Sequence, residues 1–226
     1  MKKETQTLVH AVVTILLVFL SIVIIFAKLP IEREMREVQK IFYYHVGIAW
    51  TMFLAFLITA IGGVVYLARR NPKSDIVAGC SAELGFLYAT LVLATGMLWA
   101  RSAWNTWWNW EPRLTSTLVL WLIYAAYLLF RSSTRGERKR RFASVFGIVA
   151  FVMVPIVYFS INLWGSLLHP KTSTVRQLDP VMYWGMALGG FTMISVYLFV
   201  LFRRIELEEV AEELDRLKRD LMAERT

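Results

Sequence analysis

The residue types with the clearest chemical potential are three histidines and a dense group of tryptophans. Indole is flat and polarisable, and its N–H needs a polar partner, so one or two tryptophans at a membrane surface are ordinary. Five of the nine tryptophans here lie in one short segment, which exceeds what anchoring requires. They are Trp99, Trp104, Trp107, Trp108 and Trp110. We interpret the segment as an aromatic platform for a large planar ligand, with a dense aromatic belt as the alternative.

The backbone of this platform has two possible geometries. In a helical turn, Trp104, Trp107 and Trp108 would share one face, whereas an extended chain would pair Trp108 with Trp110. Pro112 disfavours helical geometry at the residue before it and suits the first turn of a following helix. The sequence therefore predicts a short interfacial element that breaks just before Pro112.

Two of the histidines fall at the same membrane depth as the tryptophans. His45 lies at the start of the second apolar block, and His169 lies just beyond the end of the fifth. Imidazole is the common axial ligand of haem iron, and two imidazoles saturate it. Pro170 biases His169 away from helical geometry, so its ring can turn toward the platform. His10 lies near the start of the first block, on the side of the membrane away from the tryptophans, and is interpreted as a solvated cap.

The basic residues and the cysteine count narrow the choice of ligand. Haem propionates can pair with the basic residues on the same side, which are Arg101, Arg113, Lys171 and Arg176. A zinc ion would ordinarily recruit cysteines, carboxylates or a third histidine as well. The single cysteine, Cys80, lies in an apolar block and no C-x-x-C-H motif occurs, which excludes covalent attachment of haem to this chain.

Apolar residues make up 57% of the chain, and the mean hydropathy is +0.51. They form blocks of roughly 17 to 23 residues, the length that crosses the hydrocarbon core. The sequence therefore predicts an all-α polytopic membrane protein with six transmembrane helices. Pro155 should kink the fifth, and Glu83 is expected at the interface because a carboxylate in lipid is costly. The expected spans are 8–27, 46–68, 76–98, 114–130, 142–163 and 181–202.

An even number of spans places both termini on one side. Thirteen lysines and arginines lie on the side of the termini, counted up to Arg204, against eight in the opposite loops. The positive-inside rule then puts the termini in the cytoplasm and the tryptophan segment outside. Topology explains most of the net charge of +8, so we expect contact with membrane lipid and no nucleic acid.

Two amphipathic stretches accompany the spans. Helical spacing predicts a surface helix over 28–40 that starts at Pro30, with apolar positions Ile31, Met35, Val38 and Phe42. After the sixth span, apolar residues step by three and four along a charged helix: Leu207, Val210, Leu214, Leu217 and Leu221. The expected division is a six-span domain, 1–202, and a cytoplasmic amphipathic helix, 203–226, which packs on this protein or docks a partner.

The stretch from Trp104 to Ser116 reads W-N-T-W-W-N-W-E-P-R-L-T-S. It resembles the tryptophan-rich WWD signature of the haem-handling proteins of cytochrome c maturation. Six spans, one such loop between the third and fourth, and flanking histidines are similar to the CcmC family over essentially the whole chain. The related CcmF and CcsA types carry more spans and additional histidines.

The resemblance implies that haem b is bound non-covalently at the outer face and delivered to the periplasmic haem chaperone CcmE. It also implies the ABC-type subunits CcmA and CcmB and the small protein CcmD as partners, in the bacterial inner membrane. The implied axial ligands of the iron are His45 and His169. The chain departs from the signature at Glu111, where Asp is usual, and at Pro112. Two roles stay open for Glu111: contact with the chaperone or capping of the fourth span. The candidate haem contacts are His45, His169, Trp104, Trp107, Trp108, Trp110, Glu111, Arg113, Arg101 and Arg176.

The prediction is thus a haem-presenting protein and not an enzyme, since presentation needs no general acid, base or nucleophile. A b-type electron-transfer subunit with two histidine ligands is the main alternative, although such proteins usually carry both ligands on spans. A transporter with only an aromatic belt outside is a third reading. It would need ionisable residues along a cavity, and the spans carry few.

Overall fold

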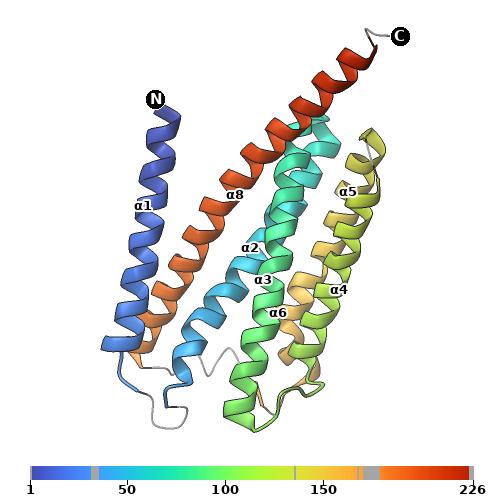
Figure 1. The fold of residues 1–226 in the computed structure, drawn as a ribbon. Coiled ribbons are helices and arrows are strands. Elements are labelled where there is room, and N and C mark those ends of the chain that lie inside the picture. Colours follow the sequence, from blue (N-terminus) through green and yellow to red (C-terminus); the bar gives the residue numbers. More distant parts are fainter. Residues whose placement is uncertain (1, 32–35, 135, 167, 170–178, 224–226) are drawn as a thin grey trace.

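A computed structural model describes residues 2–31, 36–134, 136–166, 168–169 and 179–223. The helices are α1 (Lys2–Val23), the π-helical η1 (Ile24–Lys28), α2 (Gln39–Arg69), α3 (Pro72–Trp104), α4 (Pro112–Ser133), α5 (Gly136–Phe151), α6 (Met153–Trp164) and α8 (Pro180–Ala223). Within these residues, six helical stretches are long and apolar enough to cross a membrane, which confirms the predicted fold class. The Lys2 end of α1 and the Ala223 end of α8 lie at one end of the bundle (Figure 1). The α3–α4 connection lies at the opposite end.

Local signals set the boundary between the second and third spans. Arg70 adopts the left-handed conformation with φ 53° and ends α2. Asn71 then caps α3, because its side-chain oxygen accepts a hydrogen bond of 3.1 Å from the Lys73 amide. Pro72 occupies the first helical position, where its missing N–H costs nothing. The end of α2 and the start of α3 therefore lie beyond the apolar blocks, at the residues that cap each helix.

The fifth span is interrupted, as Pro155 predicts. α5 ends at Phe151, Val152 forms a turn, and α6 begins at Met153. Proline has no N–H to donate to the carbonyl four residues earlier, which here is the carbonyl of Phe151. Next to this carbonyl, the Val152 amide donates to the carbonyl of Val149 at 3.1 Å. These residues are three apart in sequence, where an α-helix would pair residues four apart, so the turn is tightened.

The predicted surface helix over 28–40 is wrong for the residues that the structure describes. Leu29 is extended with ψ 136°, as the residue before a proline prefers, and Arg36 is left-handed with φ 50°. The polar residues at the end of this stretch belong to α2 and are buried. Gln39 donates to the Tyr43 hydroxyl at 3.0 Å, and Lys40 donates to the Phe26 carbonyl at 2.9 Å. Partners in the interior, which no local pattern reveals, override the surface-helix periodicity.

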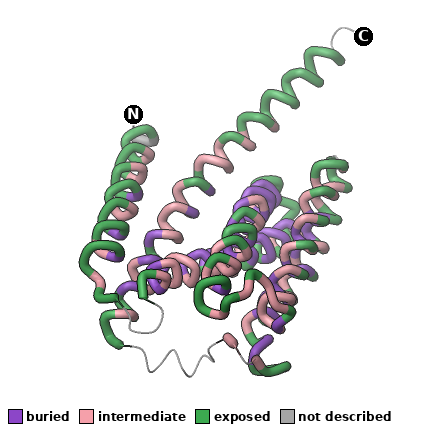
Figure 2. The backbone as a smooth tube through the Cα atoms, turned by 60° about the horizontal axis from the view of Figure 1, so that its bottom comes forward, coloured by how far each residue is buried: buried purple, intermediate pink, exposed green. Residues whose placement is uncertain are grey.

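α2 lies at the centre of the bundle and packs against α3, α8 and α5. Buried residues gather in the middle of the bundle, whereas exposed ones run along most of α1 (Figure 2). Small residues allow the closest approach: a Cβ on Gly47 would lie 2.8 Å from the Gly189 carbonyl oxygen of α8. Ser81 of α3 donates to the Ala55 carbonyl at 2.7 Å, and its oxygen accepts from Tyr197 of α8 at 2.7 Å. These contacts fix the positions of the helices that carry the site.

α8 passes from the sixth span into the charged tail without a break. The predicted boundary at 202/203 therefore lies within one helix, between its apolar part and its charged part. Arg204 forms an ion pair of 2.8 Å with Glu83 of α3 and another with Glu208 one turn along. The apolar side chains of the heptad positions are all exposed: Leu207, Val210, Leu214, Leu217 and Leu221. The acidic side of the tail thus contacts the bundle while the apolar side faces away.

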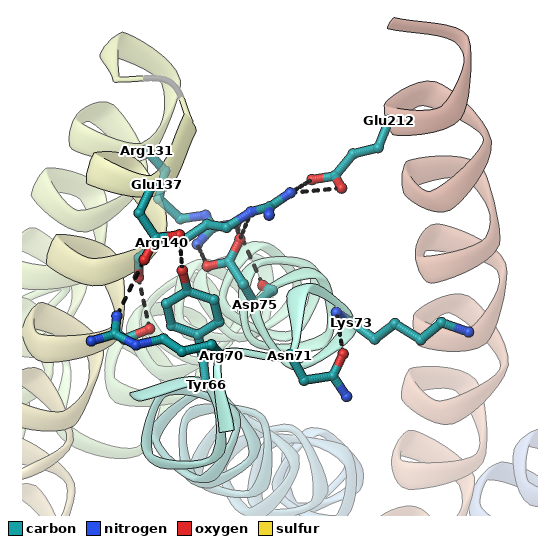
Figure 3. A network of polar contacts seen from close by, with 10 residues as sticks. Tyr66, Arg70, Asn71, Lys73, Asp75, Arg131, Glu137, Arg140 and Glu212 are labelled. Atoms are coloured by element: carbon teal, nitrogen blue, oxygen red, sulfur yellow. Dashed lines mark hydrogen bonds and ion pairs between the residues drawn. The ribbon is translucent and has the colours of Figure 1, made fainter. Parts of the chain in front are cut away.

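A polar network around a buried carboxylate joins α3, α4, α5 and α8 (Figure 3). Its centre is Asp75, whose side chain is 2% exposed. Arg131 donates to both carboxylate oxygens of Asp75, at 2.7 and 3.1 Å. Arg140 lies 3.9 Å from the same carboxylate and reaches Glu212 of α8 at 2.9 Å. Two arginines from different helices therefore converge on one buried carboxylate.

Candidate functional site

The tryptophan segment is mostly irregular backbone between α3 and α4. α3 ends at Trp104 because Asn105 is left-handed with φ 56°, and Arg101 donates to the Asn105 carbonyl at 2.8 Å. Residues 105–111 are not helical, so Trp107 and Trp108 do not continue the face of Trp104. Of the two predicted geometries, the helical turn is therefore wrong beyond the last residue of α3.

The segment ends at an extended residue before a proline. Glu111 has ψ 151° and Pro112 opens α4, so the break lies where the sequence predicts it. The Asn109 side chain accepts from the Glu111 amide at 2.9 Å, and Thr106 donates to the Trp108 carbonyl at 2.9 Å. These local bonds hold the irregular chain in one conformation.

A partly enclosed cavity of about 250 Å³ lies between the tryptophan segment, α2, α3, α4 and α6. Five of the predicted haem contacts line it: His45, Trp104, Trp108, Arg113 and His169. The two imidazoles are close enough for a charge on one to act on the other. The remainder of the lining is largely apolar.

Several lining residues were absent from the sequence-based site. They include Phe42, Trp50 and Tyr158. Trp99 belongs to the predicted aromatic platform and also lines the cavity, although it was not among the candidate haem contacts. Part of the signal was present, because Phe42, His45, Ala49, Met52 and Phe53 follow the spacing of a single helix face. The face of a helix is readable from sequence, but the neighbour across the cavity is not.

His45 is carried by α2 and packs against α3. Its Nδ1 lies 2.8 Å from the Thr95 hydroxyl oxygen. A Cβ on Gly96 would lie only 3.3 Å from the His45 Cε1 atom, so a glycine leaves the room that the ring occupies. Because one ring nitrogen faces Thr95, the other is left for the cavity.

His169 lies outside the helices and is held by Glu111. Its Nδ1 is 3.4 Å from a Glu111 carboxylate oxygen, and its amide N–H donates to the Ser166 hydroxyl at 2.8 Å. The imidazole packs on Trp104 with ring centroids 5.1 Å apart. An ionised carboxylate only accepts hydrogen bonds, so Nδ1 carries the proton and Nε2 keeps its lone pair.

Glu111 organises the chain around His169. One carboxylate oxygen accepts from the Ser166 hydroxyl at 2.6 Å, and the other accepts from the Leu168 amide at 2.9 Å. Burial alone would raise the pKa of the Glu111 carboxyl, but the hydrogen bonds that it accepts outweigh burial and lower that pKa. The carboxylate is therefore ionised at pH 7. No hydrogen bond from this side chain caps α4, so the capping role proposed from the sequence is wrong.

Burial, followed by the charge of Arg113, lowers the pKa of His169 to about 4, although Glu111 acts in the opposite direction. The imidazole is therefore neutral at pH 7, the state in which it can coordinate a metal.

Two indole N–H groups at the cavity have no partner among the described residues. These buried nitrogens are Nε1 of Trp99 and Nε1 of Trp108. Arg113 uses part of its guanidinium to donate to the Tyr158 carbonyl at 2.9 Å, and a guanidinium has five N–H groups in all. A ligand with acceptor oxygens would satisfy such donors, since a buried N–H without a partner is costly. The donor set thus fits a carboxylate-bearing, largely apolar ligand.

The other predicted contacts lie elsewhere. Arg101 caps the end of α3 and is exposed, and Trp107 and Trp110 are exposed and do not line the cavity. The Trp110 ring packs on Trp108 at 5.6 Å between centroids, next to the cavity wall. Arg176, like Lys171, falls outside the described residues. Among those described, no three His, Cys, Asp or Glu side chains cluster as ligands for a bare metal ion.

Comparisons with known proteins find a matching family and relatives over most of the chain. The family model "Heme exporter protein C", CcmC, matches residues 2–220. "Heme exporter protein C" of Bradyrhizobium diazoefficiens is 31% identical over 191 residues, covering 80% of this chain and 71% of the relative. The protein of that name in Escherichia coli K12 is 26% identical over 183 residues, covering 79% and 74%. A ccmC-like mitochondrial protein of cytochrome c biosynthesis from Marchantia polymorpha is 30% identical over 171 residues, covering 76% and 72%.

Proposed function

Since the chain belongs to the haem exporter protein C (CcmC) family, we propose that it holds haem b non-covalently between His45 and His169 and passes it on. A role in haem export for cytochrome c biogenesis follows from the family. The residues that bind the cargo, and the protein that receives it, are our proposal. In this scheme the chain acts as a carrier and not as an enzyme.

One observation carries the proposal. Two histidines, one from α2 and one from the chain after α6, line the same cavity. Each has its Nδ1 occupied, by Thr95 for His45 and by Glu111 for His169, so the Nε2 atoms are available for the cavity. This is the usual arrangement of metal-ligating histidines, in which the second nitrogen binds a neighbour that orients the ring.

The other lining residues would hold the porphyrin. Trp104 and Trp108 offer flat apolar surfaces, and Arg113 with the unpartnered indole N–H groups would donate to the propionates. Trp107 and Trp110 are exposed next to this site and suit contact with the edge of the cargo or with the receiving protein. We retain Arg101 and Arg176 as candidates for propionate contact once haem is bound.

The orientation of the bundle in the membrane determines which side each proposed partner would meet. With both termini in the cytoplasm of a bacterial cell, the cavity opens at the periplasmic face of the inner membrane. The receiver would be the haem chaperone CcmE. CcmA, CcmB and CcmD would contact the membrane helices or the cytoplasmic tail, whose exposed apolar side is available for a partner helix.

The test is to purify the protein in mild detergent and record its optical spectrum, then add haem-free CcmE. We expect bound haem with the six-coordinate, low-spin spectrum of two histidine ligands, and its transfer to the chaperone. A protein that retains no haem, or haem without nitrogen ligands, would refute the proposal. Steady reduction by a quinol and reoxidation by a cytochrome would favour the electron-transfer alternative.

Glu111 gives a further prediction. Glu111→Gln keeps the shape of the side chain but removes the charge that accepts from His169 and Ser166, so haem affinity should fall by roughly 10- to 100-fold. Glu111→Asp keeps the charge and should retain most of the affinity. Haem titration followed by absorbance measures both variants, and equal affinity of Glu111→Gln and wild type would contradict the role assigned to this carboxylate.

A further inference from the structure

His45 makes a contact with α3 that the sequence did not suggest. Its Nδ1 lies 2.8 Å from the hydroxyl oxygen of Thr95, well within hydrogen-bond distance. The ring also packs beside Gly96, where any side chain would crowd it. α3 therefore determines both the position of the ring and the partner of one of its nitrogens.

The direction of this hydrogen bond follows from the other bond of the same hydroxyl. A threonine hydroxyl has one proton and two lone pairs. Thr95 is 2.7 Å from the Leu91 carbonyl, a contact in which only the hydroxyl can donate, and 3.4 Å from the Val92 carbonyl. This bond to the preceding turn is common for threonine in helices. Because the hydroxyl proton of Thr95 is used in that bond, its oxygen must accept from His45 Nδ1. His45 therefore carries its proton on Nδ1.

We infer that Thr95 is a positioning residue that holds His45 in the Nδ1–H tautomer, with the Nε2 lone pair directed into the cavity. The inference rests on the proposed function, in which that lone pair binds haem iron. The opposite tautomer would place an N–H where the ligand atom is needed. Thr95 does for His45 what Glu111 does for His169, but through a neutral acceptor in place of a carboxylate.

The test compares three variants of the full-length protein in detergent. Thr95→Val has nearly the same shape and removes the acceptor, whereas Thr95→Ser keeps the hydroxyl. The matched control is Thr90→Val. Thr90 lies on the same helix, donates to the carbonyl four residues earlier at 2.9 Å, and accepts from a ring N–H, that of Trp121, at 2.8 Å.

Two readouts separate positioning from general damage. In haem-free protein, 15N chemical shifts of His45 should show the Nδ1–H tautomer in wild type, Thr95→Ser and Thr90→Val, and a shift toward Nε2–H in Thr95→Val. In haem titrations, Thr95→Val should lose roughly 10- to 100-fold in affinity, with the other two variants within about twofold of wild type.

The inference is overturned if Thr95→Val keeps the Nδ1–H tautomer, whether or not its haem affinity falls, or if Thr95→Ser behaves like Thr95→Val. Failure of the proposed function looks different. Haem binding that is indifferent to His45→Ala would remove histidine ligation at that position, while the 15N measurement on haem-free protein would still report what Thr95 does to the ring.

Discussion

Replacing either His45 or His169 by alanine is expected to abolish the spectrum of haem with two histidine ligands and to lower haem affinity by more than about 100-fold, the upper end of what loss of a supporting partner costs. The reason is that the cavity offers one imidazole from each side, and the described residues lining it include no further histidine. The remaining ligand should leave a five-coordinate, high-spin haem. Absorbance and electron paramagnetic resonance of the purified variants measure the change.

Two controls isolate the ligand atom. Added imidazole should enter the space left by the removed ring and restore the six-coordinate spectrum of each variant. His10→Ala should change nothing, because His10 packs on Phe199 and Phe202 and does not line the cavity. An unchanged spectrum in both His45→Ala and His169→Ala would show that the ligands have been misassigned.

The second large effect is on stability. Asp75→Asn leaves Arg131 buried without its carboxylate partner, and breaking such a pair typically costs about 3–5 kcal/mol. Unfolding by sodium dodecyl sulfate in mixed micelles, followed by tryptophan fluorescence, should give a clearly lower midpoint. The substitution also removes the carboxylate that faces Arg140, so the contact of α5 with the tail should loosen.

Removal of both charges provides the matched comparison. Asp75→Leu combined with Arg131→Met should recover much of the loss, because two apolar side chains replace the buried pair and Arg140 keeps its partner Glu212. Glu209→Gln, in an exposed pair with Lys73, should cost no more than about 1 kcal/mol. Equal midpoints for Asp75→Asn and wild type would show that the network adds nothing to stability.

The six spans were predictable because their causes are local. Blocks of apolar residues mark the membrane helices, and Asn71, Pro72 and Pro112 mark where helices begin. The interruption before Pro155 follows from a missing N–H. Such features depend on neighbours along the chain, so one sequence is enough to read them.

Errors arose where a distant partner decides the outcome. Gln39 and Lys40 look like surface residues of an amphipathic helix, yet hydrogen bonds to the interior make them the first turn of α2. The interfacial position of Glu83 stays a prediction, but its ion pair with Arg204 is a long-range contact that nothing in the local sequence indicates.

The same limit applies to the site. The histidines and tryptophans were predicted from their chemistry and membrane depth, but the neighbours that orient each imidazole were not. Thr95 looks like any threonine in a span, and Glu111 was expected either to contact the chaperone or to cap a helix, not to orient His169. Only the packing of α2 on α3, and of the chain after α6 on the tryptophan segment, brings these groups to the rings.

The most direct measurement is a structure of the haem-loaded protein determined in detergent or nanodiscs. We expect the iron within bonding distance of Nε2 of both His45 and His169, with the propionates near Arg113 and the indole N–H groups of Trp99 and Trp108. Iron bound to only one of these histidines, or haem located outside this cavity, would contradict this expectation.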